Sequence, residues 1–267
     1  WKRIQKAGLT EAEVGYLWMD DSLGLILDKL DTLGIADNTI VVFVSDHGSE
    51  RKGSLIKTRG TEIPCLIRWP KVIKPGSISN GLLQNTDFVP TWFELAGAKI
   101  PEDYHIDGKS LLPMFQDPSV SVRKFIYAEQ GAARAIKTDE WEYISLRYTD
   151  EQIASAQGNR SDRAFKTFLG LSGGISRAKD FHPGTFSADQ LYHLTHDPTS
   201  QKNLAGDQGY ARQLRKMKSM LTNTVKKLGP RPYGDFVPGK GTNDAATSQK
   251  ILDKLSVYHT TNGKKKK

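Results

Sequence analysis

The 267-residue chain has little cysteine and no long hydrophobic run. Its single cysteine, Cys65, excludes an intrachain disulfide. The longest continuous apolar run, Ile40–Val44, is far shorter than the ~20 residues that a membrane-spanning helix needs. No basic stripe with interleaved aromatic residues is present, and Lys264–Lys267 supply four of the eight net positive charges. The sequence therefore predicts neither a membrane span nor a nucleic-acid partner.

The remaining composition is that of an ordinary globular protein, with 37% hydrophobic and 25% charged residues. At roughly 100–200 residues per domain, the length indicates one or two domains. The chain begins at Trp1 rather than at a methionine. We interpret this as a start inside a longer polypeptide.

A helix followed by a strand is predicted near the beginning. Apolar residues recur at three- and four-residue steps over Leu17–Leu33, which predicts an amphipathic helix, and Gly34 is a typical stop. The β-branched run Thr39–Ser45 predicts a strand buried on both faces. A helix, a short turn and a buried strand make half of a βαβ unit, so we expect an α/β fold with a parallel sheet.

Asp46 and His47 follow the predicted strand directly. Ligands of open α/β sheets bind at the carboxyl ends of the strands, where a carboxylate and an imidazole can both face a metal. The alternative is an aspartate that caps a turn beside a surface histidine. The sequence leaves both interpretations open.

A basic segment comes next, with Lys52 and Lys57 among its cations. Positive charge beside a metal suits a sulfate or phosphate ester, because negative charge builds up as the group is transferred. The alternative is an exposed basic loop without a catalytic role.

Further elements are predicted up to residue 124. We expect a strand over Cys65–Trp69, a helix over Asp87–Ala96 and a connecting loop over 98–124. Cys65 sits between Pro64 and an apolar run, which favours a buried strand residue over a nucleophile.

The pattern changes after about residue 122, where short β-type segments follow each other closely. Their spacing favours antiparallel pairing, with Thr138 and Asp139 in a tight turn. A helix over Tyr210–Lys226 follows, with an apolar face. The predicted strands are Phe125–Glu129, Arg134–Lys137, Tyr143–Tyr148 and Leu191–Leu194.

Several segments together resemble the C-terminal part of a formylglycine-dependent sulfatase, in the alkaline phosphatase superfamily. The likeness covers roughly residues 15–225, and its order and spacing are specific. The segments that carry it are Met19–Gly34, Asp37–Gly48, Lys52–Leu55, Glu62–Pro70, Asp87–Gly97, Asp107–Pro113, Gln190–Pro198 and Asn203–Ala205.

The resemblance implies roles for individual residues. Asp46 and His47 match the family's second pair of metal ligands. The metal implied is calcium, with magnesium as the alternative. Lys52 matches the lysine that contacts the sulfate and the leaving oxygen. The segment after Lys52 departs from the family's pattern and is one residue longer, so Lys57 is a rival for the same role.

The resemblance also implies three regions. Residues 1–121 would form the C-terminal half of the catalytic α/β domain, part of an alkaline-phosphatase-like sheet flanked by helices. Residues 122–228 would form a small α+β subdomain with an antiparallel sheet and a helix. Residues 229–267 would form an extended basic tail.

The family's nucleophile motif, Cys/Ser-x-Pro/Ala-x-Arg, is absent, and so is its first pair of acidic metal ligands. Asp20 and Asp21 belong to the later helix and are not that pair. We therefore expect formylglycine in an N-terminal half that this sequence does not contain, and no turnover by these 267 residues alone. That half would be needed as a partner for a complete site.

The reaction implied is hydrolysis of a sulfate ester of a sugar, an aryl alcohol or choline. Two alternatives remain: a phosphoryl or phosphonyl ester hydrolase of the same superfamily, and a non-catalytic fragment that serves as an interaction module. The resemblance favours an exported location, whether periplasmic, extracellular or lysosomal.

Overall fold

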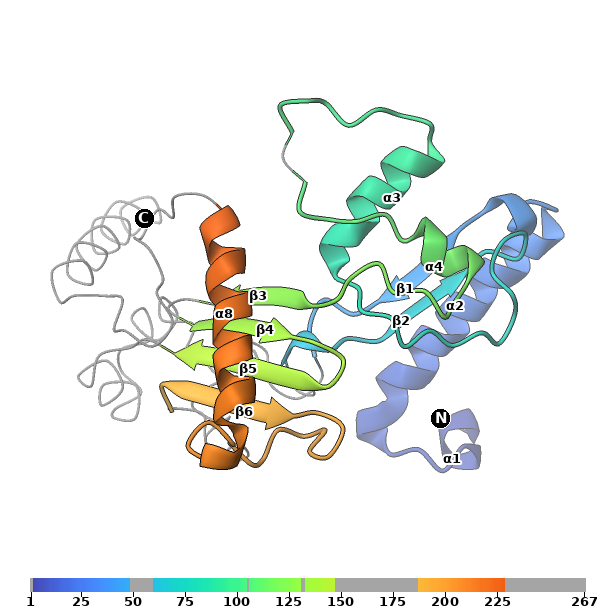
Figure 1. Cartoon of the computed structure of the whole chain (residues 1–267). Coiled ribbons are helices and arrows are strands. Elements are labelled where there is room, and N and C mark those ends of the chain that lie inside the picture. The colour runs from blue at the N-terminus through green and yellow to red at the C-terminus, as the bar shows by residue number, and fades with distance from the viewer. Residues whose placement is uncertain (1, 49–59, 105, 131–132, 147–186, 229–267) are drawn as a thin grey trace, which may run out of the picture.

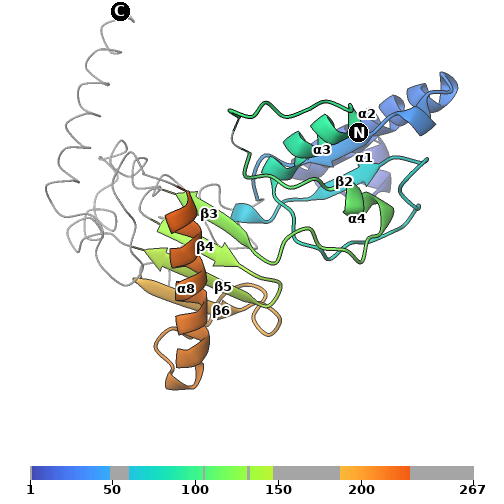
Figure 2. The ribbon, with the colours of Figure 1, turned by 45° about the horizontal axis from the view of Figure 1, so that its top comes forward.

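The computed structural model describes residues 2–48, 60–104, 106–130, 133–146 and 187–228. One part of the chain holds the helices α1 to α4 and a two-stranded sheet, and the other holds a four-stranded sheet crossed by α8 (Figures 1 and 2). We refer to them as the α/β part and the C-terminal sheet. No helix in the described ranges has the length and apolar character needed to cross a bilayer.

The predicted first helix is present as α2, Val14–Thr32, after a short α1, Lys2–Lys6. Gly34 follows the C-cap residue Leu33 and has a φ of 66°, which a glycine adopts without steric cost. None of the residues of α2 is buried. Its apolar stripe therefore lies largely uncovered by the residues that the structure describes, with Met19 44% and Ile26 54% exposed.

The strand before the Asp46-His47 pair is β1, Val41–Val44, and it pairs with β2, Cys65–Arg68. The pair is antiparallel, with Val42 opposite Ile67, so the predicted parallel arrangement is wrong for this pair. A helix before a strand fixes the order of the elements but not the direction of the neighbouring strand. The predicted burial of this strand on both faces is also wrong, because no residue of β1 is buried and Val44 is exposed.

The helix predicted over Asp87–Ala96 is present as α3, Phe88–Leu95. A short α4, Leu112–Gln116, interrupts the connection that was predicted as a loop, and Pro113 stands at its start. Leu111, Met114 and Phe115 form a small core under α4. Short 3₁₀ turns lie at Glu11–Glu13, Ala36–Asn38, Asn85–Asp87 and Gln208–Tyr210.

A buried carboxylate joins α3 to the segments around it. Asp87 is fully buried, and its oxygens accept hydrogen bonds from the backbone N–H of Gln84 at 2.8 Å and of Lys109 at 2.7 Å. Arg123, just before the C-terminal sheet, donates to both oxygens of Asp87, with Nε to Oδ2 at 2.7 Å. The carboxylate is therefore fully satisfied, as a buried charge must be.

The four predicted C-terminal strands are present in one antiparallel sheet in the order β3-β4-β5-β6. The turn predicted at Thr138 and Asp139 joins β4 to β5, and the backbone N–H of Thr138 donates to the Trp141 carbonyl at 2.8 Å. The strands are Ile126–Gln130, Ala133–Lys137, Trp141–Leu146 and Asp189–His193.

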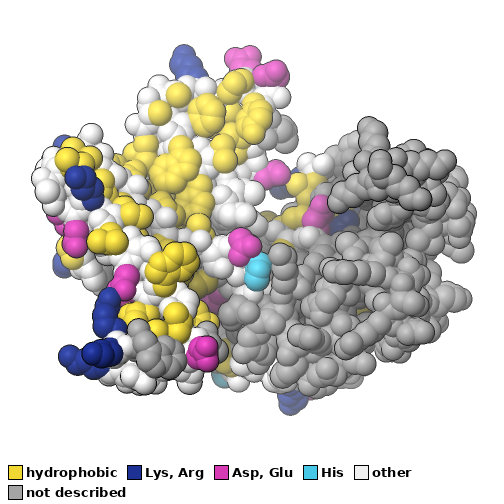
Figure 3. All heavy atoms as spheres, turned by 180° about the vertical axis from the view of Figure 1, so that it is seen from behind, with side chains coloured by type: hydrophobic (Ala, Val, Ile, Leu, Met, Phe, Trp, Pro, Cys, Tyr) yellow, Lys and Arg dark blue, Asp and Glu magenta, His cyan; other side chains and the backbone are white. Residues whose placement is uncertain are grey.

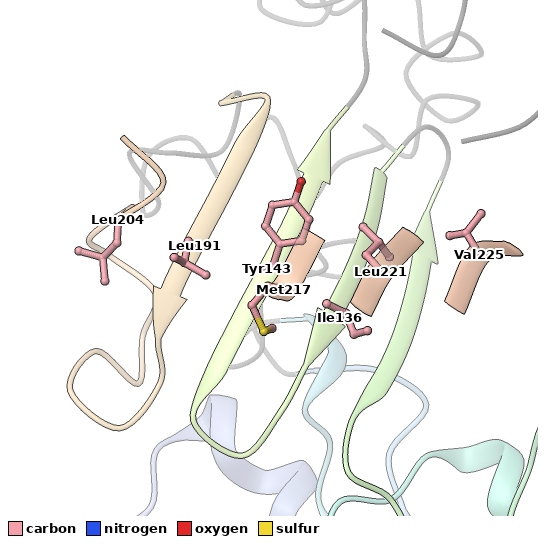
Figure 4. Packing of buried hydrophobic residues seen from close by; sticks show 7 residues of the cluster. All are labelled: Ile136, Tyr143, Leu191, Leu204, Met217, Leu221 and Val225. Carbon is pink, nitrogen blue, oxygen red and sulfur yellow. The ribbon is translucent and has the colours of Figure 1, made fainter. Parts of the chain in front are cut away.

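The helix α8, Ala211–Lys227, covers one face of this sheet (Figure 1). Side chains from three strands and the helix form a closed core between them, as Figure 4 shows. The predicted apolar face of α8 is confirmed, since Met217, Leu221 and Val225 are buried. The other labelled members are Ile136, Tyr143, Leu191 and Leu204.

The boundaries predicted at residues 121 and 228 stay predictions. The basic tail predicted over 229–267 lies outside the described residues.

Candidate active site

Asp46 and His47 lie at the carboxyl end of β1 and close to each other. His47 Nε2 is 3.6 Å from Asp46 Oδ1. The Asp46 side chain is 80% exposed and that of His47 37% exposed, so both are open to a ligand. The geometry places a carboxylate and an imidazole side by side, as a shared metal ion would require.

The ring of His47 has a defined orientation. Its Nδ1 lies 2.8 Å from the carbonyl oxygen of Gly48. Because a carbonyl oxygen can only accept, this contact requires the proton on Nδ1. In the neutral ring of that tautomer Nε2 carries a lone pair, and Nε2 is the nitrogen next to Asp46. A backbone carbonyl that orients a histidine in this way is a common partner of metal-binding histidines.

Backbone hydrogen bonds hold this turn against the segment that leads into β2. The N–H of Ser45 donates to the Pro64 carbonyl at 3.3 Å, and the N–H of Gly48 donates to the Gly60 carbonyl at 3.1 Å. The Ser45 hydroxyl also donates to the carbonyl of His47 at 2.8 Å. The two ends of the connection between Gly48 and Gly60 are therefore fixed to each other.

The donor set fits part of a divalent-cation site. A carboxylate oxygen and an imidazole nitrogen are both ligands of such cations, although calcium prefers oxygen. Among the described residues there is no group of three or more histidine, cysteine, aspartate or glutamate side chains that is able to hold a metal. A complete site would therefore need further ligands beyond Asp46 and His47.

Lys52 and Lys57, the two predicted catalytic lysines, lie outside the described residues. The choice between them stays open. Asp46 and His47 are the predicted site residues that the structure describes, and it brings those two together.

A third lysine reaches this region, and sequence reasoning missed it. Lys137, in β4, donates a hydrogen bond from Nζ to Oγ1 of Thr61, the residue after Gly60. The contact spans 76 residues in sequence, so no local pattern announces it. The one available signal was a lysine at an inward position of a strand whose neighbours on that face are apolar.

The surroundings of Asp21 and Cys65 do not suit a metal ligand or a nucleophile. Asp21 accepts two hydrogen bonds from Arg3, at 2.6 and 2.8 Å, on the exposed side of α2. Cys65 is partly buried in β2, and desolvation by burial raises the pKa of its thiol. A raised pKa lowers the thiolate fraction, which is the opposite of what a nucleophile needs.

The comparison with known proteins decides between the families that such a site allows. The sulfatase family model matches residues 15–98, which include α2, β1, the Asp46-His47 pair, β2 and α3. Residues 15–98 thus belong to the sulfatase family. An ulvan-active sulfatase of Formosa agariphila is 32% identical over 214 residues. An N-acetylglucosamine-6-O-sulfatase of Bacteroides thetaiotaomicron is 28% identical over 222 residues.

A solved structure gives the same assignment. It is that of a protein in complex with its substrate D-glucosamine-2-N,6-O-disulfate, and it superimposes with a TM-score of 0.58 at 25% identity. The match covers 79% of this chain and 39% of that one. The fold is thus the alkaline-phosphatase-like α/β fold of the sulfatases, as the resemblance in the sequence implied.

The sulfatase matches cover only part of the relatives. The alignments span 76% and 79% of this chain but 40% and 34% of the two curated sulfatases. This partial coverage fits the resemblance to the C-terminal portion of the family's domain. The chain therefore carries one portion of what a sulfatase of this family contains.

Proposed function

We propose that the polypeptide carrying this chain hydrolyses a sulfate ester of a sugar, and that Asp46 and His47 supply two ligands of its divalent cation. The observation that carries the proposal is the side-by-side placement of these two residues at the end of β1, inside the segment that matches the sulfatase family. We propose calcium as the cation, with magnesium as the alternative.

In this proposal Asp46 and His47 hold the cation with different atoms. Asp46 contributes a carboxylate oxygen with negative charge, and His47 contributes the Nε2 lone pair that its contact with Gly48 leaves available. The bound cation would polarise the oxygens of the sulfate ester, which makes the sulfur easier to attack. The backbone bonds of Ser45 and Gly48 keep the two ligands in position before the substrate arrives.

The lysine role belongs to Lys52 in this proposal, with Lys57 as its rival. A positioned ammonium group stabilises the negative charge that grows on the leaving oxygen as the ester bond breaks. The support is the match of Lys52 to the family's lysine motif, together with its place a few residues after the Asp46-His47 pair.

The nucleophile comes from elsewhere in the polypeptide. Cys65 has the wrong motif around it and a raised thiol pKa. We propose a formylglycine in the part of the domain that precedes α2, where its hydrate would attack the sulfur. On this view the 267 residues by themselves have no turnover.

An exposed apolar surface supports such a further part. Trp18 and Leu25 of α2 are 75% and 71% exposed, and Leu66 of β2 is 62% exposed. Figure 3 shows hydrophobic side chains gathered over the α/β part. Large apolar patches of this kind usually mark a surface that another segment covers. We propose that the remainder of the sulfatase domain covers it, since the relatives extend well beyond the matched length.

The proposed substrate class rests on the relatives. One is named for N-acetylglucosamine 6-O-sulfate chemistry, and the matched solved structure holds a sulfated glucosamine. We therefore propose a 6-O-sulfated amino sugar ahead of aryl or choline sulfates.

The test compares ester types on the complete polypeptide, expressed with its formylglycine-forming system. Release of inorganic sulfate from glucosamine 6-sulfate is measured beside release of phosphate from glucosamine 6-phosphate. We expect sulfate release to exceed phosphate release by at least tenfold in kcat/KM. Faster phosphate release would instead establish a phosphoryl hydrolase. Release of neither would refute the proposed amino-sugar substrate, and a further failure on aryl and choline sulfates would favour a non-catalytic module.

A further inference from the structure

The C-terminal sheet carries a buried ion pair at the end that faces the α/β part. Lys137 and Glu142 are direct cross-strand partners in the β4–β5 hairpin, with Nζ 2.8 Å from Oε1. Lys137 is 3% exposed and Glu142 is fully buried. Figures 1 and 2 show that the β4–β5 turn lies on the side of the sheet nearest β1 and β2.

This arrangement is costly to maintain. Taking two charges out of water is unfavourable, and their mutual attraction offsets this only in good geometry. Ser200 donates to Glu142 Oε2 at 3.2 Å, and its backbone has a φ of 55°, which is the one positive φ outside glycine in the described ranges. Strain of this kind persists where the surroundings enforce it and is concentrated at functional sites.

The Lys137–Glu142 pair also contacts the segment next to the Asp46-His47 turn. Lys137 Nζ donates to Oγ1 of Thr61 as well as pairing with Glu142. Thr61 directly follows Gly60, whose carbonyl accepts from the N–H of Gly48, the residue after His47. A short path of contacts therefore runs from Glu142 through Lys137 and Thr61 to the Asp46-His47 turn.

We propose that Lys137 is a positioning residue for the Asp46-His47 pair. With Glu142 holding its ammonium group in place, Lys137 fixes Thr61 and Gly60, and Gly60 fixes the turn through Gly48. The C-terminal sheet thereby sets the geometry of the candidate metal ligands, although it supplies none of them. The inference about catalysis rests on the proposed function, whereas the mechanical link does not.

The first test is amide hydrogen exchange on the 267-residue chain. Thr61→Val removes the acceptor for Lys137 but keeps the shape of the side chain and leaves the Lys137–Glu142 pair intact. We expect exchange at the amides of Ser45 and Gly48 to rise about tenfold, the effect of losing one hydrogen bond to a charged group. Thr61→Ser keeps the hydroxyl and should restore the wild-type rate.

Matched variants separate a local effect from a general one. Thr39→Val removes another threonine hydrogen bond of the α/β part, from Oγ1 to the Ile35 carbonyl at 2.8 Å, and should leave both amides unchanged. The double variant Lys137→Met with Glu142→Leu removes the whole pair without leaving a lone buried charge. It should reproduce the effect of Thr61→Val, whereas Lys218→Met, which breaks the pair with Asp189 on the α8 side, should not.

The outcomes decide the proposal. It is overturned if Thr61→Val changes exchange at Ser45 and Gly48 by less than twofold, or if it raises exchange equally along β3 to β6. In the complete polypeptide, Thr61→Val should lower kcat about tenfold with little change in KM, and Thr61→Ser should recover it. A complete polypeptide with no sulfatase activity would refute the proposed function but leave the exchange result as the test of the link.

Discussion

The two sheets of this chain bury their apolar residues to very different extents. In the C-terminal sheet, Tyr143, Leu191, Met217 and Leu221 are fully buried between the strands and α8. In the α/β part, α2 has no buried residue, and Leu66 of β2 is 62% exposed. The same chain thus contains one region whose own residues close its hydrophobic core and one whose apolar faces are largely uncovered by the described residues.

The difference indicates which region stands alone. Full burial of a Leu or Met side chain stabilises a fold by roughly 1.5–3 kcal/mol. The C-terminal sheet collects that gain within its own residues, whereas α2 and β2 do not. We therefore expect the α/β part, which carries Asp46 and His47, to depend on further chain for its stability, and the C-terminal sheet to be largely independent of it.

The largest effect is expected at Asp87, where the two regions meet. Asp87→Asn leaves Arg123 buried and half-paired, which should lower the free energy of unfolding by about 3–5 kcal/mol. Asp31→Asn is the matched control, because Asp31 and Arg68 form an exposed Arg–Asp pair at 3.0 Å. That control should cost no more than about 1 kcal/mol. Urea denaturation measures the free energy of unfolding of both variants. Equal losses would show that the buried Asp87–Arg123 pair contributes no more to stability than an exposed pair.

The second prediction tests the difference in burial directly. Leu191→Ala in the C-terminal core should cost about 2–5 kcal/mol, because it leaves a cavity in a closed core. Leu66→Ala should change the stability of the 267-residue chain by less than about 0.5 kcal/mol. In the complete polypeptide, Leu66→Ala should become destabilising by about 2 kcal/mol, because the covering segment then buries the side chain.

The contradicting result would come from the complete polypeptide. If Leu66→Ala changed the free energy of unfolding as little there as in the shorter chain, the rest of the domain would not pack on the exposed apolar surface.

A smaller effect is expected at Cys65, on β2. Burial raises the pKa of its thiol, so the thiolate fraction at pH 8 is lower in the folded chain than in the unfolded chain. We expect its reaction with a thiol reagent at pH 8 to be slower than in urea, and to accelerate as the pH is raised. A folded-state rate equal to or above the unfolded rate would make Cys65 an activated thiol after all.

Local patterns predicted most of the elements. The strands β3, β4 and β5 could be predicted because their connections are short and β4–β5 turns at Thr138 and Asp139. The strand β6 was predicted from its own apolar pattern, since it begins at Asp189, far along the chain from the end of β5 at Leu146. The position of Asp46 and His47 at the end of a strand followed from the apolar run before them. The direction of β2 could not be predicted, because it depends on how the chain returns between Gly48 and Gly60.

Contacts between segments that are distant in the chain could not be predicted from the sequence. Arg123 meets Asp87 across 36 residues and Lys137 meets Thr61 across 76, and neither pair lies at a helical or strand spacing. Such pairs depend on how the two regions pack, which no local pattern encodes. The apolar stripe of α2 was predicted correctly as a pattern, but its exposure depends on which segment packs against it.

The most direct test of the central claim is the metal dependence of two variants of the complete polypeptide. Asp46→Ala should lose activity because it removes a cation ligand, and excess calcium or magnesium should partly restore it. Lys52→Ala should lose about 10²–10³ in rate, roughly 2.7–4 kcal/mol, through the transition state, and added metal should not restore it. If Asp46→Ala keeps wild-type activity and wild-type metal dependence, the Asp46-His47 pair is not the metal site and the account is wrong.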